Sequence, residues 1–154
     1  IYIDNDVYIY PDAQELPDIS GLMNVREPEG NSSKIFREVN KLNNDTKYFN
    51  SGVTFCDKNT ANILSTYMIY RLNNKIRSKG KNSDNMLLNE FIIENKNIFQ
   101  ELGPEWNYMP FLQNSQKISK PNFFHFVGIA GKQIINKLQD NKIEILDFLK
   151  EIKK

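Results

Sequence analysis

IYIDNDVYIY, residues 1–10, places two short apolar runs on either side of an acidic turn. This pattern predicts two β-segments with Asp4-Asn5-Asp6 between them. Two carboxylates separated by one residue at a sheet edge offer hard oxygen ligands, which Mg²⁺ and Mn²⁺ favour. Asp and Asn also form ordinary turns between hydrophobic runs, so the motif alone leaves both interpretations open.

The single histidine of the chain lies in another apolar run, FFHFV at residues 123–127. The aromatic and β-branched residues of this run predict a strand. His125 could join Asp4 and Asp6 at a divalent cation and leave room for phosphate oxygens. The sequence therefore predicts a metal site built from two distant strands. A buried histidine in the core is the structural alternative.

A segment with two glycines, GIAGK at residues 128–132, follows that strand. We expect a loop there, because small residues let backbone amides approach an anion and the lysine supplies positive charge. The segment is not a Walker loop, since the G-x-x-x-x-G-K-S/T pattern is absent. It predicts a phosphate contact beside the expected metal site.

Two further polar segments could line the same cleft. Asn50-Ser51-Gly52 lies near the start of a predicted strand over residues 48–56, where the glycine indicates a bulge or a close backbone approach. Asp84-Asn85 begins a predicted helix, for which Asp84 is a good N-cap. As functional residues, Asn50, Asp84 and Asn85 would orient a sugar. As structural residues, they would form a bulge and a helix cap.

The composition suits one folded domain over residues 1–154, with 40% apolar and 25% charged residues. A net charge of +1 argues against a nucleic-acid partner, which needs a strong positive field. The one cysteine, Cys56, excludes an internal disulfide and a Cys-rich zinc site, and its apolar strand predicts a buried, inert thiol. No run approaches the roughly 18 apolar residues of a membrane span, so we expect no integral membrane segment. The location is left open, with the cytoplasm or the membrane periphery expected for a bacterial protein.

Strands that alternate with helices indicate an α/β architecture. Apolar residues at helical spacing predict the helices, and Gly, Pro and polar clusters predict the loops between them. We expect a polar loop over 17–34, with a short helical turn within it as the alternative to an entirely irregular loop. Along the rest of the chain we expect a helix over 60–76 capped by Thr60 or Asn59, a loop over 78–83, a helix over 84–102 ended by Gly103-Pro104, an extended aromatic stretch over 106–111 and a last helix over 141–152. The aromatic stretch is expected in the core, with a sugar-stacking platform as the alternative.

Taken in order along the chain, five segments resemble the family 8 glycosyltransferases, the group that includes lipopolysaccharide galactosyltransferases and glycogenin. The matching stretches are IYIDNDVYIY (1–10), YFNSGVTFCD (48–57), DNMLLNEF (84–91), EWNYMP (105–110) and FFHFVGIAGK (123–132). The order of all five is more specific than any single motif. The resemblance implies a GT-A fold, an α/β nucleotide-diphospho-sugar transferase fold that is here truncated before the Asp-x-Asp strand.

The resemblance also implies a role for each candidate residue. The implied metal ligands are Asp4, Asp6 and His125, the implied cofactor-binding residues are Gly128 and Lys132 at the diphosphate together with Asn5, and the implied catalytic residues are Asp84, Asn85 and Asn50 at the sugar. The implied metal is Mn²⁺ or Mg²⁺. The implied reaction transfers a hexose from a nucleotide sugar, typically of UDP, to a glycan or glycolipid acceptor of the lipopolysaccharide type, with retention of anomeric configuration.

Two segments depart from the family's usual pattern. Asp84-Asn85-Met86 stands where Asp-Gln-Asp is usual, and Lys132 comes one residue later than in the usual Gly-x-x-Lys-Pro-Trp. We also expect that the region that binds the base and ribose in the family precedes Ile1 and is missing here. These departures favour an alternative function, a catalytically inactive remnant that acts as a binding or interaction module. A generic metal-dependent phosphate hydrolase fits the ligands but not the order of the segments.

Overall fold

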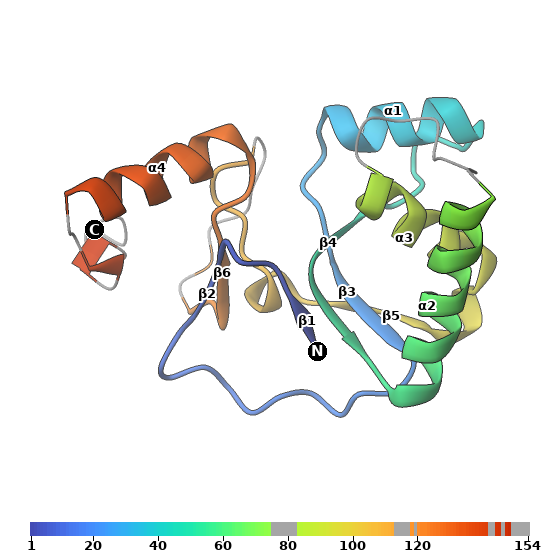
Figure 1. The fold of residues 1–154 in the computed structure, drawn as a ribbon, viewed down its shortest axis with the longest axis horizontal. Helices are drawn as coiled ribbons and strands as arrows, with labels where there is room; N and C mark the ends of the chain where they lie inside the picture. Colours follow the sequence, from blue (N-terminus) through green and yellow to red (C-terminus); the bar gives the residue numbers. More distant parts are fainter. Residues whose placement is uncertain (75–82, 113–117, 119, 142–143, 146, 149–154) are drawn as a thin grey trace.

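The structure is a computed structural model that describes residues 1–74, 83–112, 118, 120–141, 144–145 and 147–148. Two sheets form its centre. Three helices gather around the larger sheet, and a fourth lies at the opposite end of the molecule beside the smaller sheet (Figure 1). Most of the predicted last helix (141–152) and of the predicted loop at 78–83 lies outside the described residues.

The larger sheet has four strands in the order β1-β4-β3-β5, and the smaller sheet pairs β2 with β6. All pairs are antiparallel except β3 with β5, which is parallel. The strands are β1 (Tyr2–Ile3), β2 (Val7–Ile9), β3 (Leu22–Arg26), β4 (Phe49–Cys56), β5 (Phe99–Leu102) and β6 (Phe123–His125). The predicted β-segments within 1–10, the strand over 48–56 and the strand at 123–127 are confirmed.

The strand β3 lies within the stretch that the sequence predicts as a loop, so the prediction for 17–34 is wrong there. Asn24 and Arg26 interrupt the apolar pattern of this strand, so hydrophobic periodicity does not predict it. Asn24 is nevertheless fully buried. Its Nδ2 donates to three oxygens of β4, namely the main-chain oxygens of Asn50 and Val53 at 3.1 Å each and the hydroxyl of Thr54 at 2.7 Å. The neighbouring strand thus supplies acceptors for the Nδ2 of this buried side chain, which would otherwise be costly to bury.

The predicted helix over 84–102 is also shorter than expected. Helix α3 (Ser83–Glu94) ends before a short 3₁₀ turn, and residues 99–102 then form β5. Phe99 and Leu102 continue the helical spacing of apolar residues, which explains the prediction. In the structure they extend alongside β3, and the ring of Phe99 packs edge-to-face on Phe49 at 4.5 Å. Pairing with a buried central strand therefore outweighs the local helical pattern.

The remaining helices are α1 (Asn31–Asn40), α2 (Lys58–Asn73) and α4 (Gly128–Asp140), and the last described element is a 3₁₀ turn, η2 (Pro104–Trp106). The aromatic stretch predicted as extended over 106–111 therefore begins at the end of a 3₁₀ turn and contains no strand. Of the helices, α1 was not predicted. The predicted helix over 60–76 is confirmed as far as Asn73, the last residue of α2, and residues 75 and 76 lie outside the described residues. Its cap is Asp57, whose Oδ1 accepts the amide of Thr60 at 2.8 Å. Gly128–Lys132, predicted as a loop, is the first turn of α4.

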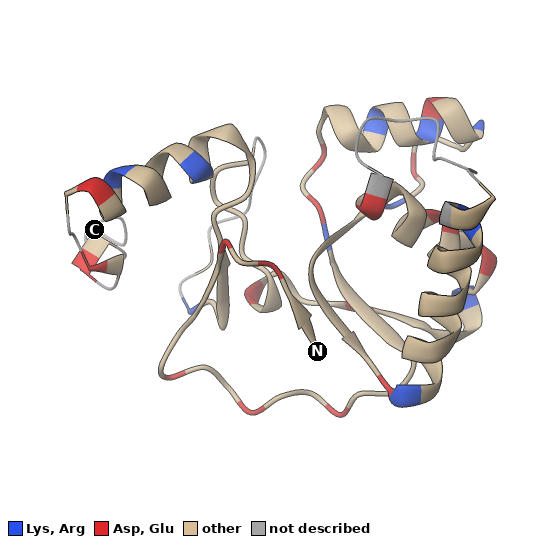
Figure 2. Cartoon of the chain, viewed as in Figure 1, with Lys and Arg blue, Asp and Glu red and all other residues tan. Residues whose placement is uncertain are grey.

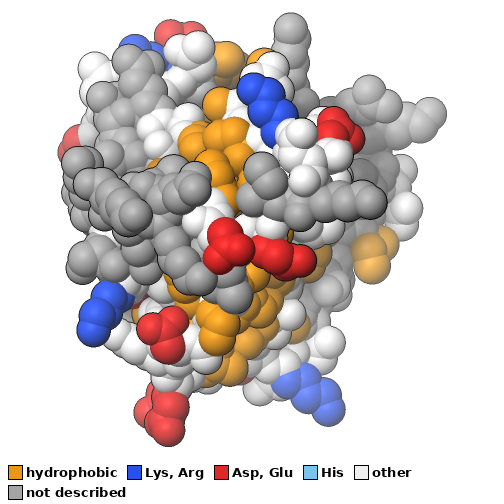
Figure 3. Space-filling view, turned by 90° about the vertical axis from the view of Figure 1, so that its left-hand side faces the viewer, with side chains coloured by type: hydrophobic (Ala, Val, Ile, Leu, Met, Phe, Trp, Pro, Cys, Tyr) orange, Lys and Arg blue, Asp and Glu red, His pale blue; other side chains and the backbone are white. Residues whose placement is uncertain are grey.

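Charged side chains are spread over the helices and the long linker between β2 and β3 (Figure 2). The acidic residues of that linker, Asp12, Glu15 and Asp18, are all exposed. A band of hydrophobic side chains runs down the face at the α4 end of the molecule, with acidic side chains beside it (Figure 3). Within the described residues, no helix has the length and apolar character needed to cross a membrane.

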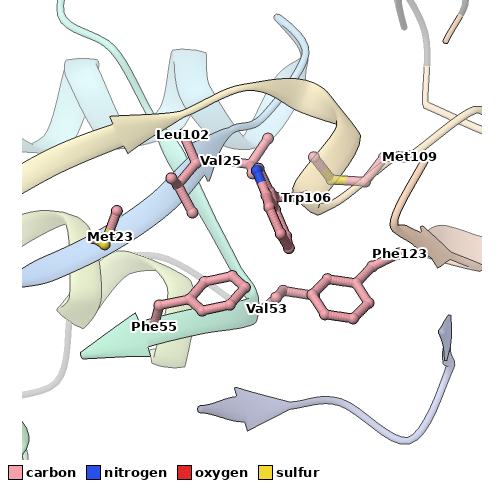
Figure 4. Packing of buried hydrophobic residues seen from close by; sticks show 8 residues of the cluster. All are labelled: Met23, Val25, Val53, Phe55, Leu102, Trp106, Met109 and Phe123. Atoms are coloured by element: carbon pink, nitrogen blue, oxygen red, sulfur yellow. The ribbon is translucent and has the colours of Figure 1, made fainter. Parts of the chain in front are cut away.

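The main hydrophobic core joins the two sheets. Phe55 of β4 meets Trp106 edge-to-face at 5.6 Å and stacks on Phe123 of β6 at 6.0 Å (Figure 4). The other buried members are Met23, Val25, Val53, Leu102 and Met109. A second cluster, formed by Tyr10, Phe124, Phe126 and Leu138, holds α4 against β6. Trp106 is therefore a core residue, as expected for the aromatic stretch, and β6 is fixed from both sides.

Candidate metal centre

The acidic turn crosses from one sheet to the other. It follows β1 of the larger sheet and precedes β2 of the smaller one, and Val7 at the start of β2 pairs with His125 at the end of β6. This register places the imidazole next to the turn. One ligand atom from each of Asp4, Asp6 and His125 lies within 4.8 Å of the others, and Nε2 of His125 is 3.2 Å from Oδ1 of Asp6. The structure thus brings together the three residues predicted as metal ligands.

Main-chain hydrogen bonds hold the turn in place. The amide of Asp4 donates to the oxygen of Gly52 in β4 at 2.8 Å, and the amide of Phe126 donates to the oxygen of Asp6 at 2.9 Å. The hydroxyl of Tyr2 donates to Oδ1 of Asp4 at 2.7 Å, and this hydrogen bond raises the pKa of Tyr2 to about 12. The main chain of the turn is therefore held next to His125 on both sides, by Gly52 of β4 and by Phe126, which follows β6.

Gly52 makes room for the imidazole. A Cβ built on Gly52 would lie 2.1 Å from Cε1 of His125, far inside van der Waals contact. The expected close backbone approach at this glycine is thus observed, and the pairing of β3 with β4 is also irregular over this stretch of β4. The side chain of His125 is only 2% exposed.

Burial lowers the pKa of His125, although the charges of Asp6 and Asp4 act in the opposite direction. The positive charge of Lys132 lowers this pKa further. A neutral imidazole is the form that binds metals, because the proton and the metal compete for the same lone pair. The environment of the ring therefore favours its ligand form.

Two residues without a predicted role complete the polar surroundings of the ring. Nδ1 of His125 lies 3.0 Å from Oδ1 of Asn107, and Nδ2 of Asn107 donates to Oδ1 of Asn50 at 3.0 Å. Nδ2 of Asn50 in turn donates to Oε2 of Glu27 at 3.0 Å. Burial raises the pKa of Glu27, which is 8% exposed. The sequence feature that could have identified Asn107 is an amide side chain between two aromatic residues, Trp106 and Tyr108. Glu27 had no such feature, because it lies in the stretch predicted as a loop.

The predicted sugar-binding residues meet where β4 runs beside α3. The amide of Ser51 donates to Oδ1 of Asn85 at 2.6 Å, and the hydroxyl of Ser51 donates to Oδ2 of Asp84 at 3.2 Å. Asn85 also reaches Oε2 of Glu27 at 3.4 Å, where Asn50 binds. Asp84 lies one residue inside α3 rather than at its N-cap position. Asn50, Asp84 and Asn85 thus form one polar group with Glu27.

The residues predicted at the diphosphate lie at the start of α4 and in the acidic turn. Gly128 has a φ of +80°, a conformation that favours glycine, and begins the helix. Gly131 packs so tightly that an added Cβ would lie 2.2 Å from the main-chain oxygen of Phe126. Lys132 and Asn5 are exposed. The first amide groups of α4 have no acceptor within the helix, and together with the helix dipole they favour an anion nearby. The helix start can therefore take the part that the sequence assigned to a loop.

The donor set fits a divalent cation. Two carboxylate oxygens and a neutral imidazole nitrogen suit Mn²⁺, and the oxygens suit Mg²⁺. Because Nδ1 of His125 is engaged by Asn107, Nε2 is the nitrogen that faces the carboxylates. The side chain of Asp6 is 16% exposed, so the site is open to solvent on one side.

Comparison with known proteins gives a family and a fold. The family model described as Glycosyl transferase family 8 matches residues 1–132. The chain is similar to the galactosyltransferase LgtC, solved in complex with donor and acceptor sugar analogs, with 17% identity and a TM-score of 0.55 over 84% of this chain and 52% of that one. It is also similar to mouse xyloside xylosyltransferase 1 in its apo form, with 17% identity and a TM-score of 0.54 over 80% of this chain and 55% of that one.

At such identities the likeness shows the fold, which is the expected α/β fold of the GT-A type. The chain spans about half the length of each of these two structures. No curated protein matches it.

Proposed function

This chain belongs to glycosyl transferase family 8, and from that premise we propose that it carries the metal-binding part of an enzyme that transfers a hexose from a nucleotide sugar. UDP is the proposed nucleotide, and a glycan or a glycolipid of the lipopolysaccharide type is the proposed acceptor. The transfer would retain the anomeric configuration. The observation that carries the proposal is the convergence of Asp4, Asp6 and His125 at the junction of the two sheets.

In this proposal, Asp4, Asp6 and His125 hold Mn²⁺ or Mg²⁺. When bound, such a cation neutralises charge on the diphosphate leaving group. Lys132 would add a positive charge near the diphosphate, because its charge acts on His125 strongly enough to lower the pKa of the ring. Gly128 would let the first amides of α4 approach the phosphates, and exposed Asn5 would contact the donor.

The sugar would lie over the polar group formed by β4 and α3. Asn50, Asp84 and Asn85 would orient its hydroxyl groups, so that the chain contributes mainly positioning and charge stabilisation. Ser51 of β4 donates to the side-chain oxygens of Asn85 and Asp84, and these hydrogen bonds restrict the conformations of both side chains. We regard residues 1–154 as a single domain. It corresponds to the later part of a glycosyltransferase domain, and this part starts at the Asp-x-Asp strand.

One observation favours the inactive module as a second candidate. Met86 stands where the family's pattern has a second acidic residue, and its side chain is 2% exposed. It packs with Phe36 and Tyr48 in a separate hydrophobic cluster, so it contributes no polar contact to a sugar. Such a remnant would act as a binding or interaction module without turnover.

The test is manganese-dependent hydrolysis of UDP-sugars by the chain, and by the longer protein if its reading frame extends upstream of Ile1. Asp6→Ala and His125→Ala are expected to abolish turnover while the circular dichroism spectrum stays that of the wild type. Asp45→Ala, at an exposed loop position, is the matched control and should keep wild-type activity. Unchanged activity in both site variants would reject the assigned ligands, and binding without turnover in the wild type would favour the inactive module.

A further inference from the structure

The side of the imidazole that faces away from the carboxylates is enclosed by protein. Nδ1 of His125 meets Oδ1 of Asn107 at 3.0 Å. Asn107 is completely buried, with 0% exposure, and His125 is 2% exposed. A hydrogen bond between two such buried groups is costly to lose, because water cannot replace it. The direction of this bond therefore matters for the chemistry of the ring.

That direction can be followed from the main chain. The amide of Gly52 can only donate, and it reaches Oδ1 of Asn50 at 2.9 Å. Nδ2 of Asn50 points the other way and donates to the carboxylate of Glu27 at 3.0 Å. The orientation of the Asn50 amide group is thus set by a donor at one end and an acceptor at the other.

The same logic extends to Asn107. Oδ1 of Asn50 also lies 3.0 Å from Asn107, so Asn107 must present its Nδ2 there. Its Oδ1 is then left for the imidazole. Because a carbonyl oxygen only accepts hydrogen bonds, the proton of this bond must be on Nδ1 of His125. In the neutral ring the lone pair is then on Nε2.

Asp6 competes for the same proton. Its Oδ1 lies 3.2 Å from Nε2, where a carboxylate would favour the opposite tautomer. The two acceptors differ in their surroundings, since the side chain of Asp6 is 16% exposed and can be hydrated, whereas Asn107 is enclosed. Leaving the buried oxygen without a donor is the costlier choice.

We propose that Asn107 is a positioning residue that sets the Nδ1–H tautomer of His125, so that the Nε2 lone pair faces Asp4 and Asp6. The orientation is transmitted from Gly52 and Glu27 through Asn50. The assignment of a divalent cation as the ligand of Nε2 rests on the proposed function, whereas the tautomer itself does not. Hydrogen bonds of this kind commonly orient histidine ligands of metals and raise their basicity.

The chain has one histidine, so labelling with ¹⁵N-histidine reports on His125 alone. Long-range ¹H–¹⁵N spectra of the metal-free chain, recorded at a pH where the ring is neutral, identify each nitrogen by its couplings to the ring protons. The wild type should show a protonated Nδ1 and an unprotonated Nε2. A neutral ring protonated on Nε2 would overturn the proposal.

Three variants separate tautomer from stability. Asn107→Leu keeps the approximate shape but removes the acceptor, and should shift the ring toward Nε2–H. Asn107→Asp keeps an acceptor at Nδ1 but turns its second oxygen toward Oδ1 of Asn50, so it should lower stability and keep the Nδ1–H form.

Asn122→Leu is the matched control, because Asn122 is also buried and accepts a hydrogen bond outside this chain of amides. It should destabilise the fold and keep the Nδ1–H form. An unchanged tautomer in Asn107→Leu would overturn the proposal.

Affinity for Mn²⁺, measured by the electron paramagnetic resonance signal of the free ion, distinguishes this inference from the proposed function. Asn107→Leu should bind Mn²⁺ about 10- to 100-fold more weakly than the wild type, and Asn122→Leu should bind like the wild type. Equal affinities of Asn107→Leu and the wild type would contradict the role of Asn107 in preparing Nε2. A wild type that shows the Nδ1–H tautomer but does not bind Mn²⁺ would reject the proposed function and leave the tautomer assignment standing.

Discussion

At the scale of residues, the site depends on a histidine that fits against a glycine. His125 is buried among aromatic residues, yet its Nε2 emerges beside the acidic turn because Gly52 has no side chain. A larger residue at this position would have to displace a ring that is held on its other side by Asn107. The close approach of one strand to one ring therefore places the third predicted ligand.

Gly52→Ala should therefore weaken Mn²⁺ binding and destabilise the fold. Its Cβ would lie 2.1 Å from Cε1 of His125, and overpacking of this kind costs about 1–3 kcal/mol. Urea unfolding and Mn²⁺ titration measure the two effects. Gly30→Ala is the control, since its Cβ would meet the main-chain oxygen of Pro28 at an ordinary van der Waals distance of 3.7 Å. Wild-type Mn²⁺ affinity in Gly52→Ala would contradict the proposed geometry.

Glu27 gives a prediction for pH. Burial raises its pKa above the ordinary value of 4.5, while the hydrogen bond from Asn50 lowers it less. The folded state therefore holds the proton more tightly than the unfolded state. As pH rises from 4.5 to the raised pKa, ionisation of Glu27 lowers the free energy of unfolding of the protein. Below pH 4.5 this penalty is relieved; above the raised pKa it is fully present.

Glu27→Gln removes the charge and keeps an oxygen that accepts from Asn50 and Asn85. The free energy of unfolding of the variant should exceed that of the wild type by a margin that grows from pH 4 to pH 8. Urea unfolding at a series of pH values measures the margin. A margin that is constant, or that grows toward acid pH, would contradict the assigned direction.

At the scale of elements, strand β4 organises the candidate site. It contributes Asn50, Ser51 and Gly52, pairs with β1 and β3, and lies beside α3. Asn89 of α3 joins the two elements, because its Oδ1 accepts the amide of Phe49 and its Nδ2 donates to the oxygen of Phe49, both at 2.7 Å. The helix that carries Asp84 and Asn85 is thus attached to the strand that carries Asn50.

Asn89→Leu should lower the free energy of unfolding by about 2–6 kcal/mol, because two main-chain groups of Phe49 lose their partner and each such loss costs about 1–3 kcal/mol in a buried setting. Asn62→Leu on α2 is the matched control, since Asn62 is exposed and surface substitutions change stability by about 0.5 kcal/mol or less. Chemical denaturation measures both. Equal stability of the two variants would show that other partners satisfy Phe49.

At the scale of the whole molecule, the candidate site lies where two sheets meet. The acidic turn leaves the larger sheet after β1 and enters the smaller one at β2, while His125 ends β6 of the smaller sheet (Figure 1). The core around Phe55 and Phe123 joins the same two sheets (Figure 4). A cation held by all three ligands would therefore add a further connection between the sheets.

Mn²⁺ should accordingly stabilise the whole chain. At a free concentration 100-fold above the dissociation constant, a ligand that binds only the folded state adds about 2.7 kcal/mol to the free energy of unfolding. Thermal unfolding with Mn²⁺ should show a higher midpoint, which EDTA reverses. Asp4→Asn should abolish most of the shift and Asp12→Asn, at an exposed linker position, should keep it. A shift that is equal in the two variants would place the ion elsewhere.

The sequence by itself determined the elements whose signals are local. The acidic turn between two β-segments, the strands at 48–56 and 123–127 and the helix after Asp57 follow from runs of apolar residues and their spacing. The order of five short segments also predicted the family and the fold. The roles of Asp84, Asn85, Asn50, Gly128, Lys132 and Asn5 stay predictions that the experiments above can test.

Only the tertiary structure decided the elements and contacts that depend on distant partners. Strand β3 pairs with β4, whose oxygens accept hydrogen bonds from the buried Nδ2 of Asn24, and β5 pairs with β3 in a parallel ladder that outweighs a local helical pattern. The link from Asn107 to Glu27 joins residues 80 positions apart, and the sequence assigned no role to either of them. Hydrogen bonds are directional and short, so the proton position on His125 depends on neighbours that periodicity cannot reveal.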